Sequence, residues 1–448
     1  MPGPMRGRRQ PPGLASVATR NREAASGEAG RALCVTVERL TYGFDALAHA
    51  DGQVVLLPYA APGDEVETRV TSVHTDYLRA EVARVTAAGP ERVVPGCPAF
   101  TVCGGCQWQH VSPTAQRAAK ARIVAEQLGR IAGVRDADVA PTVAGADDWR
   151  YRARITLVVE GRRLGYHRAR SHRLVEIDDC PIADPVVAAH VGSARAWVAA
   201  LRAVPERVTI AAAPGGVVLA GTGPARPGPR DVEATEELLA RTAAVRGAVL
   251  AGGGTRIVVG DPRVRVEVEP GVVLEAPADV FTQVNPAANV LLVQTVLAVG
   301  AFAPGVRVLD LYCGAGNFAL PIARRGAVVE GVEQSTIAVE AARENAARLG
   351  LDGATFTAAR VRDTLAARQA GAFDVVVLDP PRAGAADALR ALAALRAQRI
   401  VYVACDPATL ARDVRALVAT GYRTARITPV DLFPQTYHIE TVAELVLT

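Results

Sequence analysis

The amino-acid sequence predicts an α/β fold: a parallel, doubly wound sheet in the C-terminal part, preceded by a small β-barrel and a mixed α+β segment. Three observations support this prediction. Strand-like apolar runs alternate with amphipathic helical runs after residue 276, which is typical of βαβ units. Short β runs divided by turn residues fill residues 31–89, and a mixed pattern with three closely spaced cysteines follows them.

The first 30 residues are expected to form a disordered tail, because Pro, Gly, Ala and Arg dominate them. They contain no apolar block of signal-peptide length, and no apolar stretch of the chain approaches the roughly 20 residues of a membrane span. We therefore expect a cytoplasmic protein with no membrane partner. The net charge of +4 indicates a polyanionic partner only weakly.

Residues 31–89 contain β runs such as "ALCVTVERL" and "GDEVETRVTSV". This pattern fits a barrel of the oligonucleotide-binding (OB) type, although another small β domain fits the pattern equally well. Residues 90–275 show no single period, and a loop-like "GTGPARPGPRD" interrupts them. We expect a central α+β domain there.

The segment from 276 to 448 carries the sheet. Helical "NPAANVLLVQTVLAVG" is followed by strand-like "VRVLDLYCGAGNF", "GAVVEGVE", "FDVVVLDPPRAG" and "RIVYVACDP". Ligands of such sheets bind at the carboxyl ends of the strands. The polar residues that we single out in this segment lie next to those ends.

The glycine-rich turn in "VLDLYCGAGNFA" indicates a cofactor site. Gly314 and Gly316 allow close approach of a ligand to the backbone. The turn also matches the dinucleotide fingerprint GxGxxA, so alone it does not separate NAD from S-adenosylmethionine. Asp310 would repel a pyrophosphate but suits a cationic cofactor, and Glu333 is placed to accept hydrogen bonds from ribose hydroxyls. These two carboxylates favour S-adenosylmethionine.

The segment "LDPPRAG" predicts a wall for a planar base. Asp379 ends a strand, and the two prolines after it stiffen an extended loop. Methyltransferases that act on exocyclic amines often carry an aromatic residue after the prolines. Arg382 stands there in this chain, which disfavours an amine substrate.

Cys405 and Glu440 are candidate catalytic residues. Asp406 and Pro407 are typical of a helix start, so the Cys405 thiol is expected at a helix N-terminus with a lowered pKa. Glu440 begins the last apolar alternation, where a carboxylate needs a partner. The simpler interpretations are a small buried hydrophobic residue for Cys405 and a surface strand residue for Glu440.

A cysteine and a carboxylate together suit methylation at carbon 5 of a pyrimidine. That carbon is a poor nucleophile, but addition of a thiolate to carbon 6 makes the ring an enolate that accepts a methyl group. A base must then remove the carbon 5 proton so that the cysteine leaves. The target base would have to be unpaired or flipped out.

These motifs together resemble the uracil-5 RNA methyltransferase family, whose members make 5-methyluridine in ribosomal and transfer RNA. The likeness covers most of residues 31–448 and rests on "FTQVN", "DLYCGAGNF", "LDPPRAG", "YVACDPATLARD" and "FPQTYHIE". It implies a Rossmann-like methyltransferase domain at 276–448, with Cys405 as nucleophile and Glu440 as proton-removing base. It also implies that the barrel at 31–89 is a TRAM domain, an RNA-binding module.

The resemblance further implies the lining of the S-adenosylmethionine site. The implied residues are Gln283, Tyr312, Asn317, Glu333 and Asp379. Family members often carry Asn after the third strand, near the adenine. This chain has Arg360 at that point, and we leave it out of the site.

The cysteines of "CPAFTVCGGC" and "IDDCPIADP" predict a metal site. Four thiolates suit zinc or an iron–sulfur cluster, and the absence of paired knuckles favours iron–sulfur. The resemblance implies a [4Fe–4S] cluster in the central domain, 90–275, held by Cys97, Cys103, Cys106 and Cys180. Its expected role is structural, because methyl transfer needs no electrons. Cys34 and Cys313 are interpreted as structural.

Residues 149–173 suggest contact with RNA. They contain eight arginines interleaved with Trp149, Tyr151 and Tyr166, a pattern that suits phosphates and stacked bases; the alternative is a solvated strand pair.

The cluster and the TRAM domain that the resemblance implies favour 23S ribosomal RNA as the substrate, with no obligate protein partner. Alternatives are the same chemistry on tRNA, a non-catalytic RNA-binding protein, and an NAD-dependent oxidoreductase in which Cys405 and Glu440 have no role.

Overall fold

The computed structural model describes residues 29–448. The predicted tail, 1–30, lies outside the described residues except for its last two positions. The chain divides into two compact units, one ending at Val93 and one spanning Val94–Thr448. Among the described helices, none has both the length and the apolarity needed to cross a membrane.

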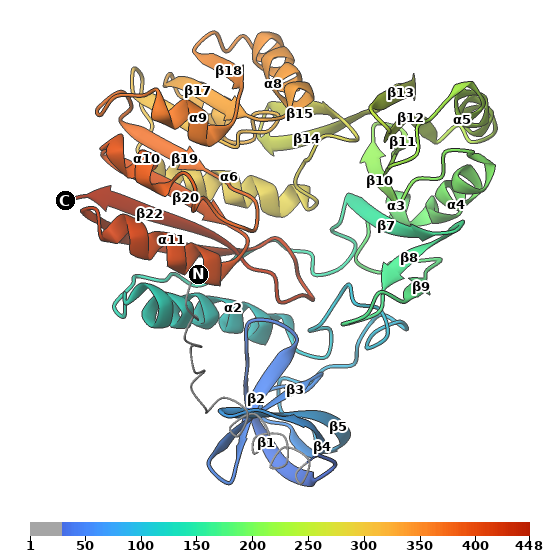
Figure 1. Ribbon diagram of the computed structural model, residues 1–448, viewed down its shortest axis with the longest axis vertical. Coiled ribbons are helices and arrows are strands. Elements are labelled where there is room, and N and C mark those ends of the chain that lie inside the picture. Colours follow the sequence, from blue (N-terminus) through green and yellow to red (C-terminus); the bar gives the residue numbers. More distant parts are fainter. Residues whose placement is uncertain (1–28) are drawn as a thin grey trace, which may run out of the picture. The chain divides into compact units, whose positions relative to one another are not determined.

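The first unit is a closed five-stranded barrel with the strand order β1-β2-β3-β5-β4 (Figure 1). Alternate residues of β1, such as Val35 and Val37, point into its core, which confirms the predicted barrel. Cys34 is exposed and takes no part in that core, so it lacks the structural role expected of it. The strands are β1 (Ala32–Leu40), β2 (Asp45–Ala50), β3 (Gln53–Pro58), β4 (Glu65–Val73) and β5 (Tyr77–Ala87).

The second unit contains a seven-stranded central sheet of order β13-β12-β11-β10-β7-β8-β9. Three helices accompany it, and the buried Trp197 of α4 donates a hydrogen bond to Thr235 of α5 (2.9 Å). The elements are β7 (Arg154–Glu160), β8 (Arg163–His167), β9 (Leu174–Glu176), α3 (Pro185–Ala189), α4 (Val191–Ala200), β10 (Arg207–Ala213), β11 (Gly216–Gly223), α5 (Pro229–Arg241), β12 (Val245–Gly252) and β13 (Thr255–Gly260).

The C-terminal sheet has eight strands in the order β18-β17-β16-β19-β20-β22-β21-β6. The strands β18, β17, β16, β19 and β20 run parallel, whereas β22 is antiparallel to both of its neighbours. The order reverses beside β16, which in doubly wound sheets marks the ligand crevice. The predicted α/β sheet is confirmed.

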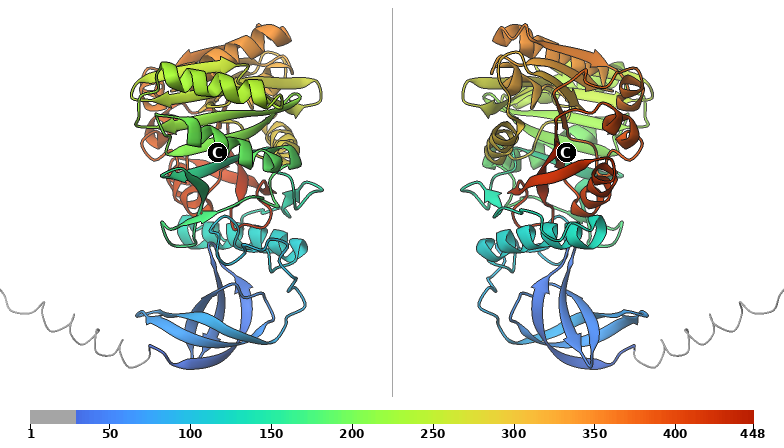
Figure 2. Two further views of the ribbon diagram at one scale, coloured as in Figure 1. Left: turned by 90° about the vertical axis from the view of Figure 1, so that its right-hand side faces the viewer. Right: turned by 90° about the vertical axis from the view of Figure 1, so that its left-hand side faces the viewer.

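The bounds of the C-terminal strands are β16 (Arg307–Leu311), β17 (Val328–Glu333), β18 (Ala354–Ala358), β19 (Val375–Leu378), β20 (Arg399–Ala404), β21 (Tyr422–Asp431) and β22 (Glu440–Leu447). The helices are α6 (Pro286–Gly300), α7 (Ala319–Ala323), α8 (Thr336–Leu349), α9 (Val361–Ala366), α10 (Leu389–Ala394) and α11 (Pro407–Val418). Figure 2 shows the central sheet facing the viewer in one view and the C-terminal strands with α11 in the other.

Segments that precede the C-terminal domain also pack on its sheet. Helix α2 (Pro113–Gln127), the π-helical turn after it (Leu128–Ala132) and the short β6 (Val143–Ala144) contact α11 and β21. The hairpin of β14 (Arg263–Glu269) and β15 (Val272–Pro277) packs on α6 and α8. One apolar core therefore runs across residue 275, and the domain boundary placed there stays a prediction.

Candidate active site

Asp310 lies in β16, beside the point where the strand order reverses. It is fully buried, and neither of its carboxylate oxygens has a hydrogen-bond partner of normal geometry among the described residues, although the Ala319 amide still favours its charged form. Burial, and then the charges of Asp379 and Glu333, hold its pKa well above the usual range. A buried polar group without a partner is costly, and a cationic or hydrogen-bonding ligand would relieve that cost.

The glycine turn after β16 is held by Glu333, the last residue of the neighbouring strand β17. Gly314 and Gly316 have φ of 54° and 99°, and a Cβ on Gly316 would lie 2.8 Å from the Leu320 side chain. Only glycine therefore fits at 316. The Glu333 carboxylate accepts hydrogen bonds from the amides of Gly314 (3.3 Å) and Ser335 (2.8 Å).

Asn317 has a partner that the sequence did not reveal. Its side-chain amide forms two reciprocal hydrogen bonds with that of Asn289 on α6, of 2.8 and 3.2 Å. Asn289 is fully buried. It lies one turn after Asn285, the N-cap of α6, and that helical spacing was the available signal. The pair fixes the orientation of Asn317.

Three expected cofactor residues remain, and they lie in three different loops: Gln283, Tyr312 and Asp379. Gln283 is half-buried in the loop before α6, and Tyr312 is half-buried directly after β16 with a φ of 63°. Burial raises the pKa of Tyr312 to about 12. Arg360 is exposed as the N-cap of α9.

Asp379 follows β19, and its amide donates to the Leu311 carbonyl (3.3 Å). Burial raises the pKa of its carboxyl to about 7. The loop after it is tied to α11, because the buried Asp413 accepts hydrogen bonds from the Ala385 amide (2.9 Å) and the Tyr402 hydroxyl (2.7 Å). The proline loop is therefore fixed relative to the helix that follows Cys405.

Cys405 and Glu440 come from adjacent antiparallel strands. The last residue pair of β20 and β22 is Ala404 with Thr441. Cys405 directly follows Ala404 and Glu440 directly precedes Thr441, so continuation of this register by one residue would set them opposite each other. Side chains of directly opposed residues point to the same face, with Cβ atoms about 5 Å apart.

The electrostatics around this pair differ from the expectation at one point. Burial, followed by the charges of Glu440 and Asp379, raises the pKa of Cys405 to about 12, so the lowered pKa expected at a helix N-terminus is wrong. Burial and Asp379 hold the pKa of Glu440 well above its usual range. Arg382 lowers the pKa of both groups, and burial together with Arg382 lowers the pKa of His438 to about 3.

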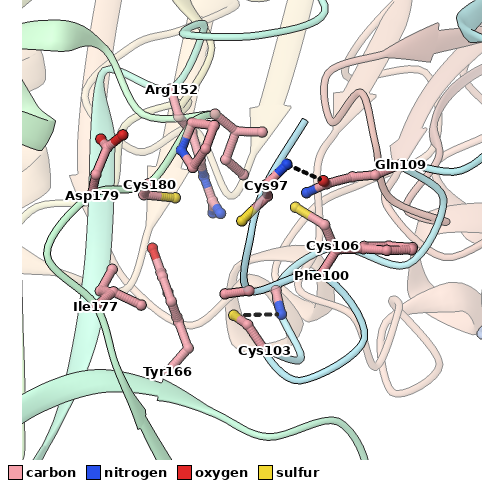
Figure 3. A pocket seen from close by; sticks show the side chains of 14 residues that line it. Cys97, Phe100, Cys103, Cys106, Gln109, Arg152, Tyr166, Ile177, Asp179 and Cys180 are labelled. Atoms are coloured by element: carbon pink, nitrogen blue, oxygen red, sulfur yellow. Dashed lines mark hydrogen bonds between the residues drawn. The ribbon is translucent and has the colours of Figure 1, made fainter. Parts of the chain in front are cut away.

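The four expected metal ligands line one cavity of about 40 Å³ in the second unit (Figure 3). Burial raises the pKa of Cys103 to about 11 and that of Cys106 to about 12, and it also raises the pKa of Cys180. The Cys97 amide donates to the Gln109 side chain (3.1 Å). Within residues 29–448, no three His, Cys, Asp or Glu side chains are arranged as ligands of one metal ion.

Several arginines of the stretch 149–173 make contacts within the protein. Arg150 pairs with Asp179 (2.9 Å), Arg154 donates to the Ala278 and Val280 carbonyls, and Arg162 donates to the Val198 carbonyl. Tyr151 is buried, and Tyr166 lies beside the cysteines with its hydroxyl buried. The two tyrosines are therefore not open stacking surfaces. The arginines between β8 and β9, at 168, 170 and 173, are exposed, as are those at 150, 162 and 163.

Comparison with known proteins places these features in context. A family model described as tRNA (Uracil-5-)-methyltransferase matches residues 263–447, and a TRAM domain model matches residues 28–83. The 23S rRNA (uracil(1939)-C(5))-methyltransferase RlmD of Alkalilimnicola ehrlichii is 36% identical, with 91% of this chain and 95% of that protein covered. The RlmD protein of Azoarcus sp. is 37% identical, with 91% and 98% covered.

A solved structure shares the fold. The Pyrococcus abyssi tRNA (uracil-54, C5)-methyltransferase in complex with S-adenosyl-L-homocysteine superposes with a TM-score of 0.70. The two chains are 24% identical, and the match covers 92% of this chain and all of the other.

Proposed function

Since the chain belongs to the uracil-5 RNA methyltransferase family, we propose that it converts a uridine of 23S ribosomal RNA to 5-methyluridine through a covalent bond to Cys405. The mechanistic part of this proposal is supported by the pairing of Ala404 with Thr441, which brings the neighbouring Cys405 and Glu440 close together, and by the effect of the Glu440 charge on the Cys405 thiol. The relatives named for 23S ribosomal RNA, which match over nearly their whole length, support the substrate. An RNA substrate also suits a cytoplasmic location.

Cys405 and Glu440 divide the reaction between them. The Cys405 thiol first gives its proton to solvent; its sulfur then forms a bond to carbon 6, and the electrons of the ring double bond move toward the carbonyl oxygen at carbon 4. Carbon 5 then takes the methyl group, and S-adenosyl-L-homocysteine is the leaving product. Glu440 removes the proton from carbon 5, the double bond forms again, and the bond between sulfur and carbon 6 breaks.

Protonation controls both steps. With a pKa of about 12, the Cys405 thiol holds its proton near neutral pH, and the thiolate is a strong nucleophile once it forms. Glu440 must also ionise before it can act as a base. Arg382, which lowers the pKa of both groups, therefore favours catalysis.

S-adenosylmethionine supplies the methyl group and a positive charge. The unsatisfied carboxylate of Asp310 and the open glycine turn fit this cofactor. We assign its binding to Gln283, Tyr312, Asn317, Glu333 and Asp379. A cationic ligand at these carboxyls would favour their ionised forms.

We further assign a [4Fe–4S] cluster to Cys97, Cys103, Cys106 and Cys180. Four thiols around one cavity with an apolar lining support it. In such a cluster each cysteine ligates a different iron, so the thiols need not converge on one point as they would around a single ion. Broad absorbance near ~400 nm with bound iron is expected after anaerobic purification; stoichiometric zinc without colour would contradict the assignment.

The remaining assignments concern RNA. The barrel at 31–89 is proposed to act as a TRAM domain that binds RNA, with 90–275 as the iron–sulfur domain and 276–448 as the methyltransferase domain. A tRNA substrate is the alternative, in line with the name of the family model.

Labelled S-adenosylmethionine offered to undermodified 23S ribosomal RNA and to undermodified tRNA separates the two substrates. We expect label in the ribosomal RNA only, and label in tRNA alone would contradict the substrate. Glu440→Gln should accumulate a covalent adduct of protein and methylated RNA that survives denaturing electrophoresis. A variant without adduct would refute the role of Glu440.

A further inference from the structure

The hairpin loop that leads to Glu440 is long, and its conformation is fixed from outside. Strand β21 ends at Asp431 and β22 begins at Glu440, with Val430 paired to Glu440. Eight residues, 432–439, connect the two strands. A loop of this length does not adopt one conformation by turn chemistry alone, so other contacts must hold it.

Four consecutive residues, the last of β21 and the first three of this loop, bind side chains from earlier in the chain. Lys120, on α2, is fully buried and is the only lysine in the sequence. The contacts are Lys120 Nζ to Asp431 (2.6 Å) and to the Phe433 carbonyl (3.0 Å), Asn285 Nδ2 to the Leu432 carbonyl (3.2 Å), and the Tyr151 hydroxyl to the Pro434 carbonyl (3.0 Å).

Gln435 is held most completely. Its φ of 69° is unusual for a residue other than glycine, and it is only 2% exposed. Its carbonyl accepts hydrogen bonds from the amides of Gln107 (3.1 Å) and Trp108 (3.0 Å). Its own amide donates to Gln116 Oε1 (2.9 Å), and its side-chain oxygen accepts from Gln116 Nε2 (3.0 Å).

Gln116 is the partner that makes this arrangement specific. It lies on α2, is 1% exposed, and also donates to the carbonyls of Trp108 (3.1 Å) and Val111 (2.9 Å). One side chain therefore joins the hairpin, α2 and the segment directly after Cys106. An apolar residue at 116 would leave several buried polar groups without partners.

The restraint extends to the neighbourhood of Glu440. The Thr436 hydroxyl donates to the Phe433 carbonyl (2.8 Å) and accepts from the His438 amide (3.3 Å). Glu440 itself is 3% exposed, and its Oε1 has no hydrogen-bond partner among the described residues. Packing and the path of the loop, rather than a bond to the carboxylate, thus direct this side chain.

Cys405 is positioned by different elements. It follows β20, and Asp406 caps α11 by accepting a hydrogen bond from the Thr409 amide (2.8 Å). None of the contacts of Gln116 described above involves these residues. A disturbance at Gln116 should therefore reach Glu440 before it reaches Cys405.

We propose that Gln116 and Gln435 are positioning residues that hold the 432–439 hairpin so that the Glu440 carboxylate faces the carbon 5 proton. This inference rests on the proposed function, because it requires Glu440 to be the base. On this proposal, the segment directly after Cys106 contacts the 432–439 hairpin through Gln107 and Trp108 and so helps to position Glu440. Loss of the Gln116 contact should slow removal of the carbon 5 proton by Glu440 more than it slows addition of the Cys405 sulfur to carbon 6.

Single-turnover assays of the full-length Gln116→Leu enzyme, with its metal content matched to wild type, test this proposal. Displacement of a catalytic group by about 1 Å costs on the order of 100-fold, so we expect release of methylated RNA to slow by about 10- to 100-fold. The covalent adduct should accumulate, and binding of S-adenosylmethionine should be unchanged. Gln127→Leu is the matched control, because Gln127 lies on the same helix, is 9% exposed, and accepts a hydrogen bond from Arg130 rather than from the hairpin.

The outcomes separate the two ideas. If Glu440→Gln forms adduct but Gln116→Leu releases product like the control, the positioning proposal is overturned. If Glu440→Gln forms no adduct, the base assignment fails instead. Should Gln116→Leu fail to fold, Gln435→Gly removes the side chain while tolerating the positive φ; normal release by that variant would equally overturn the proposal.

Discussion

Cys405 and the four cysteines of the cavity are all half-buried but differ in their neighbours. Cys405 faces Glu440, Asp379 and Arg382 at the end of a strand. The four cysteines of the cavity lie among one another, apolar side chains such as Phe100 and Ile177, and the charged Arg152 and Asp179. Burial raises the pKa of thiols in both places, so the pKa alone does not separate a nucleophile from a ligand. The neighbours that act on the pKa do: the carboxylates of Glu440 and Asp379 raise that of Cys405, whereas the other cysteines raise that of the cavity thiols. A carboxylate can accept a proton during a reaction.

The largest effect is expected from loss of the nucleophile. Cys405→Ala should lower methyl transfer by a factor on the order of 10⁴ or more, while iron content and thermal stability stay near wild type. Label transfer from S-adenosylmethionine and iron analysis of one preparation measure both. Substantial activity in this variant would end the distinction between the two cysteine groups.

The reverse pattern is expected in the cavity. If the proposed cluster is present, Cys106→Ser should lose bound iron and its absorbance, with activity reduced by about 10-fold rather than abolished, because the nearby chain contacts the 432–439 hairpin. Cys34→Ser, on the exposed face of the barrel, is the matched control. Loss of activity as complete as in Cys405→Ala would assign the cavity a direct chemical role.

The pH dependence tests the raised pKa values. Cys405 and Glu440 both act without their protons, and raised pKa values shift that state to higher pH. The single-turnover rate should therefore rise between about pH 6 and about pH 9, by up to about tenfold per unit.

Arg382→Gln removes a charge that lowers both pKa values. The variant should shift the pH profile further upward, by up to about 1 unit. A rate that falls with rising pH in the wild type would contradict the assignment of both groups.

The smallest effect concerns the cofactor. Asn289→Ala removes the partner of Asn317, and the loss of such a contact costs about 1 kcal/mol, or about fivefold in affinity. Calorimetric titration with S-adenosylmethionine measures it. Unchanged affinity would show that Asn317 needs no such support.

The strand ends were predictable from the sequence, because apolar runs stop visibly at Asp310, Asp379 and Cys405. Their convergence follows from the parallel sheet. The Cys405 pKa was not predictable, since the helix-start pattern is local, whereas the carboxylates that raise the pKa come from β19 and β22. The bonds between Gln116 and Gln435 join residues 319 positions apart, and no periodicity marks such a pair.

Tyr151 is buried, which its sequence neighbourhood did not predict. Tyr151 lies among arginines in a stretch that suggests a nucleic-acid surface. Its hydroxyl instead donates a hydrogen bond to the Pro434 carbonyl of the 432–439 hairpin. Composition describes a segment as a whole, whereas burial is decided residue by residue once the partner strand is in place. The same limit explains why α2 and β6 were expected in the central domain.

The single lysine of the chain has a practical consequence. Because Lys120 is fully buried against Asp431, amine-directed reagents have no exposed lysine side chain to modify in the folded protein. Acylation of Lys120 therefore requires that its contacts with the hairpin open. Mass spectrometry of the peptide that contains Lys120 measures the rate of acylation, and no engineered label is needed.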